Sequence, residues 1–448
     1  MTRDKQVSRG DFLRTTAATG AAAGLSTLVP NALANVPGAA AASRSRAYTG
    51  KLAVIGTGPL TPPHGLYKLF KDFEKQNPGV SISYSVMPSE RFVALFTAAQ
   101  ASGEQIDVLL LNGQDVRRYA LAGTLMNLDP IATPSIRERY QPYGIKTYTL
   151  KGHLYALPFG AIGGFPIFVN KALLDDIKMP LPKTYADLKR IGAALNKNGL
   201  GAFTHQGRNI YLWPVWFFTT FAQVTRNRSI ERTFQILSNK GKFTDPDVVQ
   251  ALDLIFQFSR DNLFTKDVLS IDTPGAQIEF LTGRAAFWMW YGSAVITPVR
   301  QQKPPHMDLH VMGMPRLVSY PVKSQFPGGV GPACIYSKIA PERKDIAVKL
   351  IEFLTTDASD AYLVQDGSES VAANQHVNGS NDPVALQLKA LVPNMTTYLD
   401  WYWPPEITRA FQEGIQAGVA GNLTAENVAK DIQNTFAGLL AQGYKFQH

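Results

Sequence analysis

The residues of this chain that could do chemistry gather near its C-terminal end, where a carboxylate and an indole are adjacent. Asp400 precedes Trp401, and Glu406 follows further along. Two carboxylates on either side of a sugar are the machinery of glycoside hydrolysis. A flat indole can instead cover the apolar face of a sugar ring while polar side chains hydrogen-bond its hydroxyls. No other feature of the sequence supports hydrolysis. The pair therefore favours sugar binding, with an exported carbohydrate-active enzyme as an alternative.

Aromatic side chains are the most prominent candidate ligand contacts. Most residues from Tyr398 to Trp403 are aromatic. A second group lies on a predicted strand over 286–290, where alternation places Trp288 and Trp290 on the same face. The sequence does not say which face of this strand lines a cleft. The predicted aromatic contacts are Phe159, Trp290, Tyr291 and Trp401.

Motifs of metal, nucleotide and nucleophilic chemistry are missing from the sequence. It contains no H-x-x-x-H, C-x-x-C, P-loop or G-x-S-x-G pattern, and its seven histidines are scattered. The run Gly56-Thr57-Gly58 lacks the third glycine of a dinucleotide fingerprint. We therefore expect no catalytic residue, no metal site and no cofactor.

Alternating strands and helices in the first third of the chain predict a parallel sheet. Apolar strands over 51–57, 80–86 and 106–111 are separated by helical periodicities, the pattern of a sheet with helices on its faces. Such sheets bind ligands at the carboxyl ends of their strands. Residues at or after these strand ends are therefore further candidate contacts: Thr57, Glu90, Asn112, Gln114 and Asp115.

Glycine-rich interruptions of apolar strands indicate a hinge between two lobes. The first lies between Tyr155 and Leu188, where a proline and three glycines break an apolar run. Similar interruptions near 290 and 328 extend this to a hinge of three strands. A chain of 448 residues is also too long for one compact core. The expected domains are an N-terminal lobe of 48–160 plus 292–328 and a C-terminal lobe of 164–288 plus 332–448.

The first 42 residues have the pattern of an export signal and linker. Basic residues precede a weakly apolar stretch, and Ala32-Leu33-Ala34 matches a cleavage site. The run from Ser8 to Arg14 resembles the twin-arginine export pattern, except that Gly10 stands in place of the second arginine. The only cysteine, Cys334, lies far from the cleavage site and cannot carry a lipid there. We expect an exported, periplasmic protein.

The distribution of charge argues against binding to nucleic acid. The net charge is +9, but the basic residues are scattered and form no stripe interleaved with aromatics. Nucleic acid is therefore not an expected partner, while an anionic ligand stays open.

Five motifs, in order along the chain, resemble family 1 extracellular solute-binding proteins of ABC importers, in the sugar-binding branch that includes maltose-binding proteins. The motifs are Asp107–Asp129, Tyr155–Leu188, Glu279–Ser293, Phe326–Gly331 and Gly421–Gln433. The resemblance implies an α/β fold of the type II periplasmic-binding-protein class, with two lobes, each a mostly parallel sheet flanked by helices, joined by a multi-strand hinge. It also implies that Asn112, Gln114 and Asp115 line the cleft. Asp115 departs from the family pattern, which has asparagine there.

The sequence thus leads to one functional hypothesis. The protein would be the exported solute-binding subunit of an ABC importer, capturing a mono- or oligosaccharide between its lobes. Asp400 and Trp401 would complete the contacts made by the 112–115 loop. The expected partners are a carbohydrate ligand and the transmembrane subunits of a permease, and the protein is expected to be a monomer. A binding protein for a polyamine or an anion is the alternative.

Overall fold

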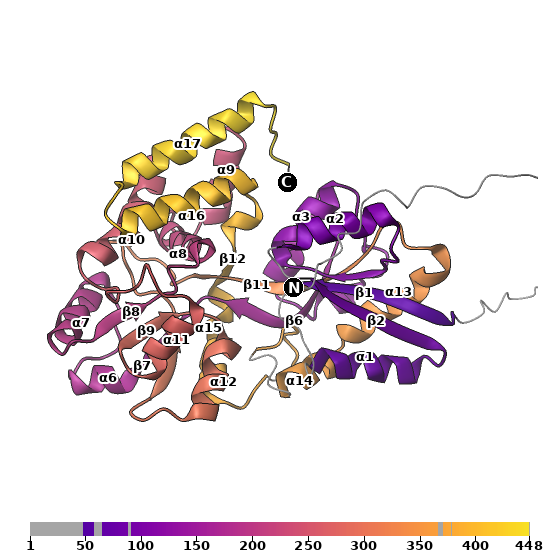
Figure 1. Ribbon diagram of the computed structural model, residues 1–448, viewed down its shortest axis with the longest axis horizontal. Helices are drawn as coiled ribbons and strands as arrows, with labels where there is room; N and C mark the ends of the chain where they lie inside the picture. Colours follow the sequence, from indigo (N-terminus) through magenta and orange to yellow (C-terminus); the bar gives the residue numbers. More distant parts are fainter. Residues whose placement is uncertain (1–47, 58–64, 88–90, 366–370, 378, 448) are drawn as a thin grey trace, which may run out of the picture. The chain divides into compact units, whose positions relative to one another are not determined.

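The computed structural model describes residues 48–57, 65–87, 91–365, 371–377 and 379–447. The predicted export segment and the candidate contact Glu90 lie outside these residues. Two larger sheets, both covered by helices, carry the fold (Figure 1). Within the described ranges, every helix is too short or too polar to span a bilayer.

The first sheet has six strands in the order β12-β11-β3-β1-β2, with β6 also paired to β11. β1 is parallel to both β2 and β3, which confirms the parallel arrangement predicted for the start of the chain. β11 is antiparallel to β3 and β6 and parallel to β12. The strands are β1 (Gly50–Thr57), β2 (Val80–Met87), β3 (Val108–Leu110), β6 (Leu157–Gly164), β11 (Phe326–Ile335) and β12 (Met395–Thr397).

The second sheet has four strands in the order β10-β7-β9-β8. The β8–β9 pair is parallel, and β7 is antiparallel to both of its neighbours. A separate hairpin joins β4 to β5. These strands are β4 (Thr149–Leu150), β5 (His153–Leu154), β7 (Ile167–Asn170), β8 (Gly201–Thr204), β9 (Ala285–Met289) and β10 (Leu309–Met312).

Helices near the first sheet include some from distant parts of the sequence. α13 and α14 pack against α1, although more than 250 residues separate them along the chain (Figure 1). Cys334, on the neighbouring β11, is fully buried, as its apolar surroundings predict. The helices of this part are α1 (Gly65–Gln76), α2 (Phe92–Ser102), α3 (Gly113–Leu121), α4 (Pro134–Arg137), α5 (Pro142–Thr147), α13 (Pro341–Leu354) and α14 (Asp357–Gln365).

The remaining helices include those that pack on the second sheet, where α6, α7 and α11 contact β8 and β9 (Figure 1). They are α6 (Lys171–Asp176), α7 (Tyr185–Lys197), α8 (Pro214–Val224), α9 (Ser229–Leu237), α10 (Pro246–Arg260), α11 (Thr273–Leu281), α12 (Gly292–Gln302), α15 (Pro383–Leu391), α16 (Pro405–Val419) and α17 (Ala425–Ala441). Short 3-10 helices are η2 (Ile210–Leu212), η3 (Val392–Asn394) and η4 (Leu399–Trp401).

Local signals in the sequence account for several helix starts. Thr184 accepts a hydrogen bond from the backbone N–H of Asp187, and the Asp187 carboxylate accepts one from the backbone N–H of Thr184 at 2.9 Å. This reciprocal capping satisfies two N–H groups that a helix end leaves open. Thr424 caps α17 in the same position. Both caps confirm the helix starts predicted from the sequence.

Strand pairing corrects the predicted division into lobes at two places. Residues 292–328 were expected in the N-terminal lobe, but β10 pairs with β7 in the second sheet, and α12 packs against α15. Residues 332–448 were expected in the C-terminal lobe, but Ala333–Ile335 pairs with β3 in the first sheet. After α12 the chain enters β10, which adds to the edge of the second sheet beside β7. The chain returns to the first sheet at β11.

A buried carboxylate holds this returning segment to the first sheet. Asp107 is fully buried, and its Oδ1 accepts from the Arg343 guanidinium on α13 at 2.8 Å. Its Oδ2 accepts from the backbone N–H of Ala53 at 2.8 Å and from the Gln105 side chain at 2.6 Å. One side chain therefore ties β1, the start of β3 and α13 together.

We predict that Asp107→Ala lowers the free energy of unfolding by about 3–5 kcal/mol, because it leaves a partly buried arginine and a backbone N–H unpaired. Urea denaturation measures the change. Asp72→Ala is the control, since Asp72 pairs with Lys68 on the surface and such pairs contribute about 1 kcal/mol or less. Equal losses in the two variants would contradict this account.

Candidate functional site

The largest cavity described has a volume of about 1020 Å³ and is lined from distant parts of the chain. One wall comes from α3, the other from the segment 400–406, α16 and the end of α17. We call it the main cavity. Its lining residues are Val93, Gln114, Asp115, Arg117, Arg118, Leu121, Ala122, Ile210, Asp400, Trp401, Tyr402, Trp403, Pro404, Pro405, Glu406, Thr408, Arg409, Gln412, Glu413, Leu439 and Tyr444.

The main cavity brings together four of the contacts predicted from the sequence. Gln114 and Asp115 reach it from α3, and Asp400 and Trp401 reach it from η4. The two groups are nearly 290 residues apart in the chain. Two separate sequence arguments, the position of ligands at strand ends and the aromatic loop, thus predict the same cavity.

The other described candidates do not line the main cavity. Asn112 precedes the first residue of α3, and Thr57 is buried at the end of β1. Phe159 is buried in β6, and Trp290 stacks on Trp288 with ring centroids 5.8 Å apart. Tyr291 lies against Phe165 at 4.5 Å. For these five residues, ligand contact stays a prediction.

The indole of Trp401 is held by close backbone approach. A Cβ on Gly113 would lie 2.2 Å from Trp401 Cη2, and a Cβ on Gly329 would lie 2.3 Å from the same atom. Real Cβ atoms do not approach so closely, so the ring fits only because both positions are glycine. Trp401 also stacks on Tyr148 with ring centroids 6.3 Å apart and planes at 20°. It remains partly exposed toward the main cavity.

Asp400 lines the main cavity, and within the described ranges one of its carboxyl oxygens has no partner. Its Oδ1 is buried and, among the described residues, has no hydrogen-bond partner. Burial raises the pKa of Asp400 from 3.8 to about 7, and hydrogen bonds from the backbone N–H groups of Asp400 and Trp401 oppose this rise. The group can therefore accept or donate a proton near neutral pH.

The Asp115 carboxylate, in contrast, already has a partner. It lies 3.1 Å from Arg118 Nη2 on the next turn of α3. Burial raises the pKa of Asp115 to about 6, and the charge of Arg118 limits the rise. Asp115 can still accept a ligand hydroxyl, but its charge is largely compensated within the protein.

Arg117 is a site residue that the sequence did not single out. Its guanidinium lies over the rings of Tyr402, at 5.8 Å, and Phe446, at 5.1 Å. Its Nη2 atom is buried and, within the described part of the chain, makes no hydrogen bond. Burial lowers the pKa of Arg117. Helical spacing was the available signal, because Gln114, Arg117, Arg118 and Leu121 repeat on one face of α3.

Trp403 adds a donor to the same wall. Its ring stacks on Phe411 with centroids 4.1 Å apart and planes at 14°. Its Nε1 is buried without a partner among the described residues. Together with Arg117 Nη2 and Asp400 Oδ1, it gives two donors and one acceptor that the protein leaves unsatisfied. Buried polar groups are costly without partners, so a polar ligand is their natural complement.

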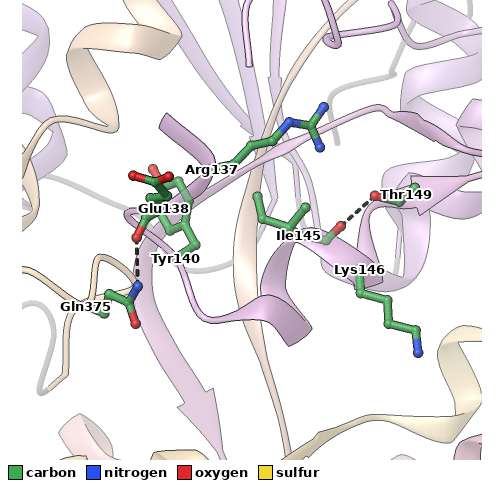
Figure 2. Close-up of a pocket in the computed structure, with 7 residues that line it drawn as sticks. All are labelled: Arg137, Glu138, Tyr140, Ile145, Lys146, Thr149 and Gln375. Carbon is green, nitrogen blue, oxygen red and sulfur yellow. Dashed lines mark hydrogen bonds between the residues drawn. The ribbon is translucent and has the colours of Figure 1, made fainter. Parts of the chain in front are cut away.

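A second cavity of about 660 Å³ lacks these features (Figure 2). Gln375 donates to the Glu138 carbonyl at 2.7 Å, and the Thr149 hydroxyl donates to the Ile145 carbonyl at 2.9 Å (Figure 2). Arg137 pairs with Asp129 at 2.8 Å. None of its described lining residues has a buried polar atom without a partner. The main cavity is therefore the candidate site. No group of three metal-binding side chains occurs in the described residues.

Comparison with known proteins decides the family. Residues 57–361, about two thirds of the chain, match bacterial extracellular solute-binding proteins. The chain belongs to this family. The members of this family are extracellular binding proteins.

Individual relatives are distant. This solute-binding protein is 25% identical, over 44% of its length and 46% of the other, to an uncharacterized ABC transporter extracellular-binding protein of Pyrococcus horikoshii. It is 24% identical to the maltotriose-binding protein of Pyrococcus abyssi, over 64% of this chain and 59% of that protein. The matches thus span about half of these curated relatives.

A solved structure confirms the fold. The maltose-bound protein MalE3 of T. maritima superimposes with a TM-score of 0.71 at 21% identity, covering 87% of this chain and 99% of that one. The predicted two-lobe α/β fold of the type II class is therefore correct. The expectation that each lobe has a mostly parallel sheet is wrong for the second sheet, in which only the β8–β9 pair is parallel. The likeness at this identity concerns the fold alone.

We predict that Asp400→Asn stabilises the protein above neutral pH. Between about pH 4 and pH 7 the folded state holds a proton on Asp400 that the unfolded state releases, so stability falls as pH rises through this window. The penalty is complete above pH 7. Removing the charge should raise the free energy of unfolding at pH 8 by about 1–4 kcal/mol, with little change at pH 4. Denaturant titrations at both pH values measure it.

The control for this prediction is Glu413→Gln, which neutralises an exposed carboxylate of the main cavity. Its effect on stability should be small at both pH values. A stabilisation by Asp400→Asn that is the same at pH 4 and pH 8 would contradict the buried, protonated state of Asp400.

Proposed function

We propose that this solute-binding protein captures a mono- or oligosaccharide in the main cavity and delivers it to the permease of an ABC importer. The observation that carries the proposal is the lining of the main cavity. Arg117, Asp400 and Trp403 present unsatisfied donors and an acceptor beside the partly exposed ring of Trp401. Sugars combine apolar ring faces with hydroxyls that both donate and accept, which suits this combination.

Similar proteins support the sugar assignment and the transport role. The relative from Pyrococcus abyssi is named for maltotriose, the similar T. maritima structure holds maltose, and the relative from Pyrococcus horikoshii is named as part of an ABC transporter. By this analogy the protein works in the periplasm after removal of the predicted leader. It would act as a monomer that docks on the transmembrane subunits of the permease.

The ligand would shift the protein between conformations only through contacts that differ between them. Gln114 and Arg117 lie on α3, beside the first sheet, whereas Asp400 and Trp401 follow β12, where the chain leaves that sheet for α16. A saccharide in the main cavity would touch both groups. This arrangement supports ligand-driven closure as the means by which the permease recognises the loaded protein.

Thermal-shift screening against maltose, maltotriose, raffinose, xylotriose and trigalacturonate tests the function. Occupancy at a hundredfold excess over Kd should stabilise the protein by about 2.7 kcal/mol. No shift with any saccharide, combined with a shift by a polyamine such as spermidine, would overturn the sugar assignment.

We predict that Trp401→Ala weakens binding of the best saccharide from this screen by roughly tenfold or more, because the stacking surface is lost. Trp401→Phe should retain part of the affinity. Isothermal titration calorimetry measures both. Tyr362→Ala, which removes an aromatic ring near Lys68 outside the main cavity, should leave affinity within about twofold. Unchanged affinity in Trp401→Ala would exclude stacking on this ring.

A further inference from the structure

Three arginines and four carboxyl groups line the main cavity. Two pairs are closed within the protein: Arg118 with Asp115 at 3.1 Å, and Arg409 with Glu413 at 2.7 Å. Three charged residues of the lining stand outside these pairs: Arg117, Asp400 and Glu406.

The two remaining acids do not neutralise Arg117. Glu406 is exposed, at the start of α16, where water and salt screen its charge. Asp400 is buried, and its pKa of about 7 means that much of it is neutral at physiological pH. Among the described residues, neither acid forms an ion pair with Arg117, and the Arg117 Nη2 atom has no hydrogen-bond partner. Arg117 is the one lining cation that the described chain leaves without a counter-charge.

The residues around Arg117 hold its guanidinium in place without neutralising its charge. The guanidinium is packed over Tyr402 and Phe446, and such cation–π contacts fix its plane without using its N–H groups. An arginine keeps its charge in proteins, so burial cannot be relieved by losing a proton. A partly buried, unpaired guanidinium is costly, and an anionic ligand group would remove that cost.

We propose that the saccharide taken by this protein carries a carboxylate, as a uronic acid does, and that Arg117 pairs with it. The inference rests on the proposed function and narrows its ligand class. A planar carboxylate matches the two parallel donors of a guanidinium. One guanidinium pairs with one such carboxylate at a time. Trp401 would cover the sugar ring, and Asp400 would accept or donate at a hydroxyl.

Size-matched trisaccharides test this directly. Binding of trigalacturonate and of maltotriose is measured by isothermal titration calorimetry at pH 7.5, in low salt and in 0.5 M NaCl. We expect trigalacturonate to bind at least about tenfold more tightly in low salt. Its affinity should fall in 0.5 M NaCl, whereas that of maltotriose should change little.

Arg117→Gln is the decisive variant, and Arg300→Gln is its control. Arg300 lies outside the main cavity and is paired with Asp382. Arg117→Gln should lose about tenfold or more in trigalacturonate affinity and little in maltotriose affinity, while Arg300→Gln changes both by less than about twofold. Thermal unfolding should show Arg117→Gln to be at least as stable as the unmodified protein, since an unpaired buried charge is removed.

Three results would overturn the inference. The inference requires maltotriose to bind more weakly than trigalacturonate. Equal or tighter binding of maltotriose would contradict the inference and leave the proposed function intact. An equal loss for both ligands in Arg117→Gln means that the guanidinium donates to hydroxyls only. Binding of citrate with no binding of either trisaccharide would overturn the proposed function as well.

Discussion

The approach of one indole ring to two glycine backbones is the constraint on which the site depends. Trp401 reaches Gly113 at the start of α3 and Gly329 on β11, and neither position leaves room for a Cβ. Gly329 in turn pairs with Gly163 on β6. The glycines of these strands therefore have a packing role in addition to any hinge role. Three segments that are distant in sequence meet at one side chain, and their meeting forms the floor of the main cavity.

Around this ring the protein leaves polar groups without partners, which works against stability. The Asp400 carboxyl has a pKa of about 7 because burial penalises its charge. Trp403 Nε1 and Arg117 Nη2 are buried and find no acceptor among the described residues. Asp107, in the first sheet, is instead fully paired, since it accepts from a guanidinium, a backbone N–H and an amide. Other buried polar atoms without partners in the described part of the chain, such as those of His205 and Asp360, lie away from the main cavity.

The sequence predicted the parts of this site that follow local rules. The end of a buried strand placed Gln114 and Asp115 correctly, and an aromatic loop with a carboxylate identified Asp400 and Trp401. The helix caps at Thr184 and Thr424 could also be predicted, because they depend on neighbouring residues alone.

What the sequence did not predict depends on tertiary contacts. In the sequence, Arg117 resembles an ordinary surface cation. Its contacts with Tyr402 and Phe446 are evident only in the folded structure. The predicted lobe boundaries differ from the strand pairing for a related reason. A glycine-rich segment indicates where a strand is interrupted, but it does not indicate which sheet the chain enters next. Gly292 begins a helix, and only the pairing of β10 with β7 shows that the chain stays with the second sheet.

The position of Arg117 also links ligand charge to conformation. A guanidinium offers its face to aromatic rings and its edge to a carboxylate, so the two interactions do not compete. Its ring partners are Tyr402, on the wall opposite α3, and Phe446, near the C-terminal end of the chain. A carboxylate on the edge would fix the plane of the guanidinium over both rings. An anionic solute would then favour the arrangement in which α3 stays beside Tyr402, whereas a neutral solute would act on that contact only through weaker hydrogen bonds. The charge of the solute, more than its pattern of hydroxyls, would then set how far binding shifts the protein toward the state that a permease recognises.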